Sequence, residues 1–169
     1  MSETFEQYTQ RILAHSAGQD PMKIQAATNK KLARLIKGIS VAKLRKRPTP
    51  DKWSVAEIVA HLADVEIVNG WRMRSILAAP GTAVQAYDQN AWLTSGHYEK
   101  RDPHKALEIH RVLRDANLAL LKSLSSDQWK LYGQHSERGQ ESIERIVRMV
   151  AGHDINHILQ IERIVKPTQ

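Results

Sequence analysis

The chain has 169 residues, a formal net charge of +7 at pH 7 and no cysteine. The missing cysteine excludes disulfide bonds, thiolate metal ligands and a cysteine nucleophile supplied by the chain itself. No apolar run approaches the ~20 residues of a membrane-spanning helix, and the first residues lack the basic and apolar regions of a signal peptide, so we expect a cytoplasmic protein with no membrane partner.

The first fifty residues predict two helices and contain all of the excess positive charge. A short helix is expected over residues 4–14. Asp20 and Pro21 then have the pattern of an N-cap followed by proline, which predicts a long helix to about residue 40. Residues 1–50 contain ten Lys or Arg against three Asp or Glu, and end in a basic cluster at 43–47. Because no base-reading motif or stacking aromatic residue accompanies this cluster, we interpret it as a solvated helix face and a basic loop.

A second long helix is predicted after the prolines at 48 and 50. Ser54 can cap its N-terminus, and Glu57 three residues later completes the pattern of a capping box. The apolar stripe continues to about residue 79, where a Pro-Gly pair ends it. Residues 80–103 form the longest stretch expected to be irregular, and a loop of this length in a small domain is usually functional. We expect it to cover or line the functional site.

Two further long helices, over about 103–124 and 141–165, flank a second expected loop at 125–140. No segment shows the period-two alternation that is typical of a sheet, so the predicted fold class is all-α. Four amphipathic helices of roughly twenty residues favour a four-helix bundle with a short extra N-terminal helix. The length suits a single domain over residues 1–169.

Three histidines on the second and fourth long helices are the candidate metal ligands. His153 and His157 are four residues apart, so in a helix their side chains lie on one face and can bind a single ion. His61 occupies an inward position on the second helix and is the candidate third ligand. Three neutral imidazoles leave one coordination position open, as in catalytic metal sites. The alternative is three separate core histidines, each bonded to a carbonyl or a water.

Four other polar residues are weaker candidates. His110 is predicted to face inward on the third helix. The alternatives for it are a fourth metal ligand, an acid or base in the pocket, and a core histidine. Arg114, one turn later, fits either an anion-binding role or a salt bridge on the helix surface. Asp154 is expected to orient a ligand or to lie at the surface, and it stands where zinc peptidases have a catalytic glutamate one methylene longer. His135 lies in the second expected loop and has no assigned partner.

The motifs together resemble the DinB-like superfamily, and within it the DinB/YfiT-type metalloenzymes, over residues 20–165. The matching residues are Trp53, Ser54, His61, Leu62, Asp64, Glu66, Arg72, Tyr87, Asp88, Trp92, Gly133, His135, Gly139, Gly152, His153, His157, Gln160 and Ile161. The resemblance implies an up-down-down-up four-helix bundle and a divalent metal, zinc, nickel or iron, held by three histidines. Carried over by position, these ligands are His61, His153 and His157.

The resemblance also implies an activity. Characterised relatives include transferases and isomerases that use low-molecular-weight thiols such as bacillithiol or mycothiol, with the metal activating the thiolate. We therefore predict a metal-dependent thiol S-transferase or related hydrolase whose partners are a small-molecule thiol and an electrophilic substrate. The alternative function is a non-catalytic stress-response or interaction protein with a structural metal and weak nucleic-acid affinity through its basic N-terminal third. A homodimer is compatible with either function.

Overall fold

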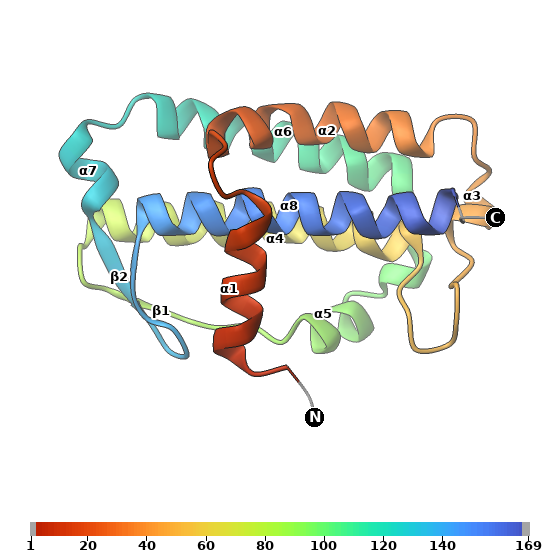
Figure 1. Ribbon diagram of the computed structural model, residues 1–169, viewed down its shortest axis with the longest axis horizontal. Helices are drawn as coiled ribbons and strands as arrows, with labels where there is room; N and C mark the ends of the chain where they lie inside the picture. Colours follow the sequence, from red (N-terminus) through yellow and green to blue (C-terminus); the bar gives the residue numbers. More distant parts are fainter. Residues whose placement is uncertain (1–2, 167–169) are drawn as a thin grey trace.

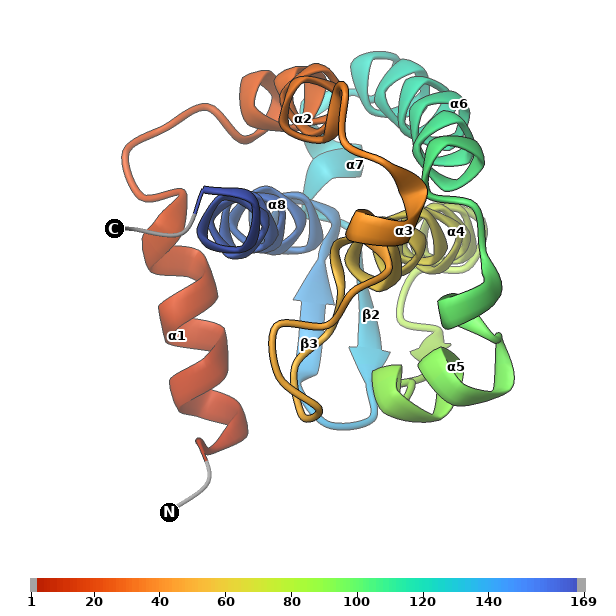
Figure 2. The ribbon, with the colours of Figure 1, turned by 90° about the vertical axis from the view of Figure 1, so that its right-hand side faces the viewer.

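Four long helices build the protein, as predicted. The computed structural model describes residues 3–166, and its long helices are α2 (Pro21–Ile36), α4 (Val55–Ala78), α6 (Pro103–Lys122) and α8 (Ile143–Val165). Viewed end-on, they form two layers, with α2 and α6 above α8 and α4 (Figure 2). The all-α four-helix bundle is therefore confirmed, with each helix ending within a few residues of its predicted boundary.

The helix directions follow an up-down-down-up order. Two hydrogen bonds between a pair of helices show whether their residue numbers ascend in the same direction. The bonds are Gln25–Val147 and Thr28–Asp154 between α2 and α8, Glu66–Arg114 and Arg74–Asn117 between α4 and α6, and Gln25–Arg114 and Asn29–Leu107 between α2 and α6. Numbers ascend together in the first two sets and oppositely in the third. Helices α2 and α8 are therefore parallel, α4 and α6 are parallel, and α2 is antiparallel to α6.

Helix ends are set by local side-chain caps. Ser54 and Glu57 form the predicted capping box at the start of α4, each accepting a hydrogen bond from the other's backbone N–H. Glu57 is 1% exposed and also pairs with Arg47 of the basic cluster, while Arg45 donates to two backbone carbonyls near residue 100. These two arginines of the cluster therefore have structural partners and hold the segment before α4 in place.

The short helix α1 (Phe5–His15) crosses α8 on the outside of the bundle (Figure 1). The crossing is close because Gly152 of α8 has no side chain: a Cβ atom there would lie 2.0 Å from the carbonyl oxygen of Ile12. Any larger residue at this position would push the two helices apart. Gly152 therefore sets the place of α1 next to the histidine-bearing part of α8.

The two expected loops contain more structure than the sequence predicted. A small sheet joins β1 (Ala83–Val84), β2 (Tyr132–His135) and β3 (Gly139–Ser142), with β1 parallel to β2 and β2 antiparallel to β3. The short helices α3 (Val41–Leu44), α5 (Gln89–Ser95), η1 (Tyr98–Lys100) and α7 (Ser126–Lys130) complete the connections. The absence of a sheet was a wrong expectation, because strands of two to four residues are too short to show a period of two.

A buried polar layer lies between the two apolar clusters of the bundle. One cluster includes Leu32 and Ile58 towards the α3 end, and the other includes Met73 and Ile146 towards the sheet. Between them, Arg114 of α6 is 2% exposed and donates to the carboxylates of Glu66 at 2.8 Å and Asp154 at 2.6 and 3.1 Å.

None of the described helices is long and apolar enough to cross a membrane.

The carboxylates of this layer have further donors. Asp154 also accepts the hydroxyl of Thr28 from α2 at 2.9 Å, and Glu66 accepts the amide of Asn117 from α6 at 3.1 Å. Burial alone would raise the pKa of Asp154, but the charge and hydrogen bonds of Arg114 outweigh it and lower that pKa. One guanidinium and two carboxylates, with the hydroxyl of Thr28, thus join all four long helices.

Replacing Arg114 by Met would leave two buried carboxylates without their shared cation. We expect this variant to lose about 3–5 kcal/mol of unfolding free energy, the range for breaking a buried ion pair from one side. Urea unfolding followed by circular dichroism measures the loss. Arg111→Met is the matched control, since Arg111 pairs with Glu108 on the exposed face of the same helix, and its unfolding midpoint should stay close to that of the parent protein. Equal losses in both variants would contradict a structural role for the buried layer.

Candidate metal centre

Three imidazoles converge where α4 and α8 face each other. His61 extends from α4, and His153 and His157 extend from successive turns of α8. The Nε2 atom of His153 lies 3.1 Å from Nε2 of His61 and 3.1 Å from Nε2 of His157. One nitrogen of each ring lies within 4.8 Å of the others. The predicted cluster of three inward histidines is therefore present in the fold.

The spacing and protonation of these nitrogens fit a shared cation. A tetrahedral ion at ~2.1 Å from each nitrogen would separate the nitrogens by about 3.4 Å, close to the two separations of 3.1 Å that His153 makes with His61 and His157. Without an ion, each short contact between two Nε2 atoms needs one ring to donate and the other to accept. The Nδ1 atom of His157 lies 2.9 Å from Oε1 of Gln160, an acceptor that places the His157 proton on Nδ1 and leaves its Nε2 lone pair free.

Burial keeps the three rings neutral. It lowers the pKa of His153 to about 3 and that of His157 to about 4, and it lowers the pKa of His61 well below the ordinary value. Neutral imidazole is the form that coordinates metals. The Nδ1 atoms of His61 and His153 are shielded from solvent and make no hydrogen bond with the residues that the structure describes. A cation bound through Nε2 would give each ring a strong partner.

The other sequence candidates lie apart from this cluster. His110 is fully buried on α6 and its Nδ1 faces the amide of Asn29 at 3.1 Å, so it does not join the three histidines. Arg114 is neither on the helix surface nor open to a substrate, because it is enclosed in the buried polar layer. Asp154 is 0% exposed, which rules out the surface alternative; through Arg114 and Thr28 it fixes the turn of α8 that bears His153.

A cleft of about 510 Å³ leads from solvent to His153. Its walls come from five parts of the chain: the N-terminal end of α1, the middle of α4, the segment at the start of α5, the turn between β2 and β3, and the middle of α8. The lining residues include Tyr8, Asn69, Arg72, Tyr87, His135 and Met149. The segment 86–90 lines the cleft, as expected for the 80–103 loop. The contributions of α1 and the β2–β3 turn have no local sequence signal.

The 80–103 segment is held against α4 by Asp64. The Asp64 carboxylate accepts the hydroxyl of Tyr98 at 2.7 Å and a guanidinium N–H of Arg101 at 2.8 Å. Asp64 lies three residues after His61, about one helical turn further along α4. This pair of contacts therefore fixes the segment that borders the cleft relative to the histidine cluster.

Several residues around the centre were among those that match the family but had been assigned no role. Gln160 orients His157, and the Trp53 ring stands edge-on to His61 with centroids 5.1 Å apart. His135, which had no assigned partner, is 3% exposed and faces Arg72 across 3.3 Å. Of these residues, Gln160 is the one whose contact the local sequence could indicate, because residues three apart in a helix are neighbours and Gln160 lies three residues after His157.

The metal-free protein should lose stability in mild acid. His153 and His157 have lower pKa values when folded than the ~6.5 of an unfolded histidine, so the unfolded state binds more protons below that pH. The free energy of unfolding should be full above about pH 6.5 and fall by up to ~1.4 kcal/mol per pH unit for each histidine as the pH drops towards 4. Urea unfolding of metal-stripped protein at several pH values measures this slope, and His157→Gln should make it shallower. A slope unchanged by that substitution would show that His157 is not buried in its neutral form.

Comparison with known proteins identifies similar chains. The "Putative metal-dependent hydrolase YfiT" of Bacillus subtilis (strain 168) is 26% identical over 113 residues, which cover 66% of this chain and 64% of that protein. The equivalently named BH0277 of Halalkalibacterium halodurans is 23% identical over 126 residues, covering 75% of this chain and 73% of the relative. The match to YfiT thus spans slightly less than two thirds of that relative's length.

Two solved structures share the fold, and a family model matches most of the chain. YfiT from Bacillus subtilis, with its unusual four-helix bundle topology, superposes with a TM-score of 0.77 at 22% identity over 96% of this chain and 89% of its own. A mycothiol-dependent maleylpyruvate isomerase has a TM-score of 0.67 at 12% identity, over 83% of this chain and 59% of its own. The DinB superfamily model matches residues 25–161. The chain therefore belongs to the DinB superfamily.

Proposed function

We propose that this protein is a metal-dependent enzyme in which His61, His153 and His157 hold one divalent ion, zinc, nickel or iron. The observation that supports this most strongly is the convergence of three neutral Nε2 atoms beside a solvent-accessible cleft that His153 lines. Three protein ligands leave a fourth position for a substrate or water, whereas a structural ion has all four positions filled by protein. His153 lines the cleft, so that position is reachable from solvent.

We further propose a small-molecule thiol as the cosubstrate, with water as its substitute in a hydrolase. A bound divalent cation would lower the pKa of such a thiol or water and supply a nucleophile at neutral pH. The chain contains no cysteine, so a thiol must come from outside. The dependence of a structural neighbour on mycothiol supports the thiol, and the hydrolase names of the relatives support water. The reaction type we favour is S-transfer to an electrophilic small molecule.

The chain's own residues orient and shield this site. Gln160 accepts the Nδ1 proton of His157 and holds the ring so that Nε2 faces the other two histidines. The Trp53 ring packs against His61 and excludes water from that side. Asp154, bound to Arg114, sets the turn of α8 from which His153 extends. Together these contacts place the ligands before an ion arrives, which reduces the ordering cost of binding it.

Metal content tests the ligand assignment. Protein purified without a histidine tag should contain about one divalent ion per chain, and His61→Ala should reduce this several-fold because two imidazoles bind far more weakly than three. Elemental analysis measures both. His110→Gln tests the fourth-ligand alternative, and His104→Ala, at an exposed position on α6, is the surface control. Both should keep the parent metal content. Equal occupancy in His61→Ala and the parent protein would refute the assignment.

Thiol dependence tests the activity. Consumption of a reactive aryl halide should require both the metal and an added low-molecular-weight thiol. Gln160→Leu should weaken metal affinity by about 10- to 100-fold, the usual effect of removing a partner of a metal-bound histidine. His157→Ala should abolish the thiol-dependent rate while circular dichroism remains helical, because the apolar clusters hold the bundle. The same thiol-dependent rate in His157→Ala and the parent protein would end the transferase proposal.

A further inference from the structure

Arg72 is a buried cation on the cleft wall without a matching carboxylate. It lies on α4, is 5% exposed and lines the cleft. One Nη2 hydrogen is donated to the carbonyl of Gln85, but its Nε is shielded from solvent and has no hydrogen bond in the described part of the chain. No Asp or Glu of residues 3–166 forms an ion pair with it, whereas neighbouring Arg138 is paired with Glu141. A buried unpaired charge is costly, so such a guanidinium favours an external anion.

His135 presents a second donor at the same place. Its Nδ1 accepts the backbone N–H groups of Glu137 at 3.1 Å and Arg138 at 3.3 Å. Burial lowers the pKa of His135 to about 4, so the ring is neutral at pH 7 and its single proton must be on Nε2. That Nε2 lies 3.3 Å from Nη2 of Arg72. Two N–H donors therefore face each other where one would expect an acceptor.

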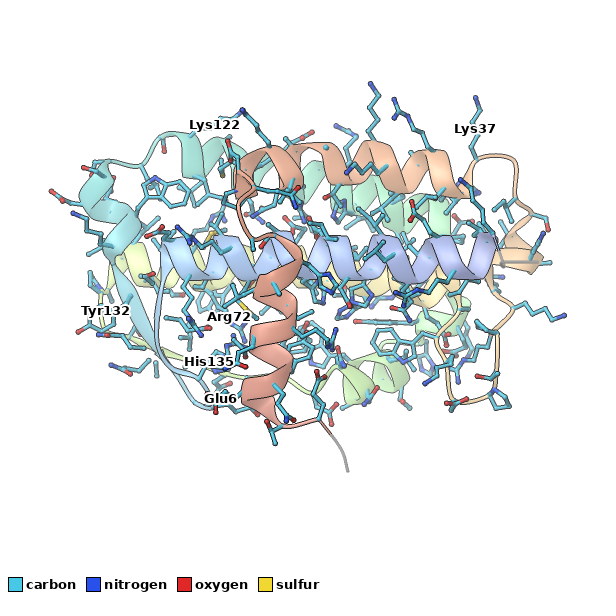
Figure 3. All side chains as sticks on the ribbon, in the orientation of Figure 1. Glu6, Lys37, Arg72, Lys122, Tyr132 and His135 are labelled. Carbon is cyan, nitrogen blue, oxygen red and sulfur yellow. The ribbon has the colours of Figure 1, made fainter. Side chains whose placement is uncertain are left out.

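An oxyanion would satisfy both donors at once. A carboxylate has two oxygens with the spacing of the guanidinium fork and can accept from Arg72 and from the imidazole N–H. Figure 3 shows the two labelled side chains next to each other below α8, beside α1. The Tyr87 ring, 5.9 Å from the guanidinium carbon, adds an aromatic wall.

The distance along α4 indicates the shape of the ligand. Arg72 follows His61 by eleven residues, three helical turns, so both lie on the same face about 16 Å apart along the axis. The cleft runs from Arg72, past Val65 and Asn69 of α4 and Met149 of α8, to His153, whose Nε2 lies 3.1 Å from Nε2 of His61. A molecule that reaches both ends must be elongated. A volume of about 510 Å³ is sufficient for such a ligand.

We infer that Arg72 and His135 bind the carboxylate of an elongated small-molecule thiol whose sulfur end lies at the histidine cluster. The inference rests on the proposed function, since the sulfur end requires the metal. A purely structural role for Arg72 explains its bond to Gln85 but leaves the opposed donor of His135 and the unpaired Nε without a purpose. The proposed substrate class is thus an acidic thiol rather than a neutral or cationic one.

The anion site can be tested without any metal. In metal-stripped protein labelled with nitrogen-15, the Nε–H resonance of Arg72 is assigned by its absence in Arg72→Lys. Octanoate should shift this resonance in a saturable way, and octanol should not. Arg74→Met is the matched control variant, because Arg74 lies two residues away on α4 and contacts Gly70 and Asn117 instead of the cleft. A titration in which octanoate leaves the resonance unmoved would overturn the inference.

The sulfur end is tested with cobalt(II)-loaded protein, whose charge-transfer absorption reports a bound thiolate. The probes are 3-mercaptopropionate, 6-mercaptohexanoate and 11-mercaptoundecanoate, each compared with the mercapto-alcohol of the same length. The acid should bind about 10- to 100-fold more tightly than its alcohol at the length that spans the cleft, the range expected for a charge-assisted hydrogen bond. Arg72→Met should remove this preference and leave the alcohol affinities and the cobalt content unchanged.

The two measurements separate the proposals. A shifted Arg72 resonance with no thiolate absorption from any probe refutes the thiol proposal and retains the anion site for an acidic electrophile. Thiolate absorption without any preference for the acids, together with an unmoved resonance, overturns the anion site and retains the metal-thiol chemistry. An acid preference that persists in Arg72→Met assigns the anion to another residue and also refutes the inference.

Discussion

The position of the histidine cluster depends on the buried ion pair network of Arg114 with Glu66 and Asp154. Arg114 extends from α6, and its two carboxylate partners extend from α4 and α8. Thr28 adds α2 through its bond to Asp154. A slip of α4, α6 or α8 by one turn would leave a charge buried without a partner, and a slip of α2 would remove a hydrogen bond from the buried Asp154 carboxylate. Both are more costly than a slip between apolar surfaces. The network thus selects one register of four helices.

That register has a direct consequence for the site. Asp154 is adjacent in sequence to His153, and Glu66 lies five residues after His61 on the same helix as His61. Fixing Asp154 and Glu66 against one guanidinium therefore fixes the turns of α8 and α4 that present the histidines to each other. The apolar clusters at either end provide the hydrophobic driving force, but apolar surfaces alone allow several registers. The charged layer decides which one brings the imidazoles together.

Burial leaves the histidines of the bundle neutral and its two buried arginines charged. The histidines become neutral, and as neutral ligands they suit a divalent cation. Arg114 stays charged because two carboxylates surround it. Arg72 stays charged with no carboxylate partner in the described chain, at the wall of a cleft, and there a ligand can provide the missing charge. A cysteine-free chain that offers a cation site and an anion site in one cleft is suited to an acidic thiol brought from solution.

The sequence by itself determined the four amphipathic helices, their caps at residues such as Ser54 and Asp20, and the three inward histidines. These features depend on residues only a few positions apart, whose spacing in the sequence determines which side chains share a helix face and which can cap a helix end. Only the tertiary structure decided that Arg114 and Asp154 are buried partners, that His110 lies apart from the cluster, and that Arg72 faces His135. It also decided the sheet, whose strands β1 and β2 are separated by almost fifty residues. Such contacts join distant segments, and no local pattern specifies which polar side chain will meet which when helices and loops pack.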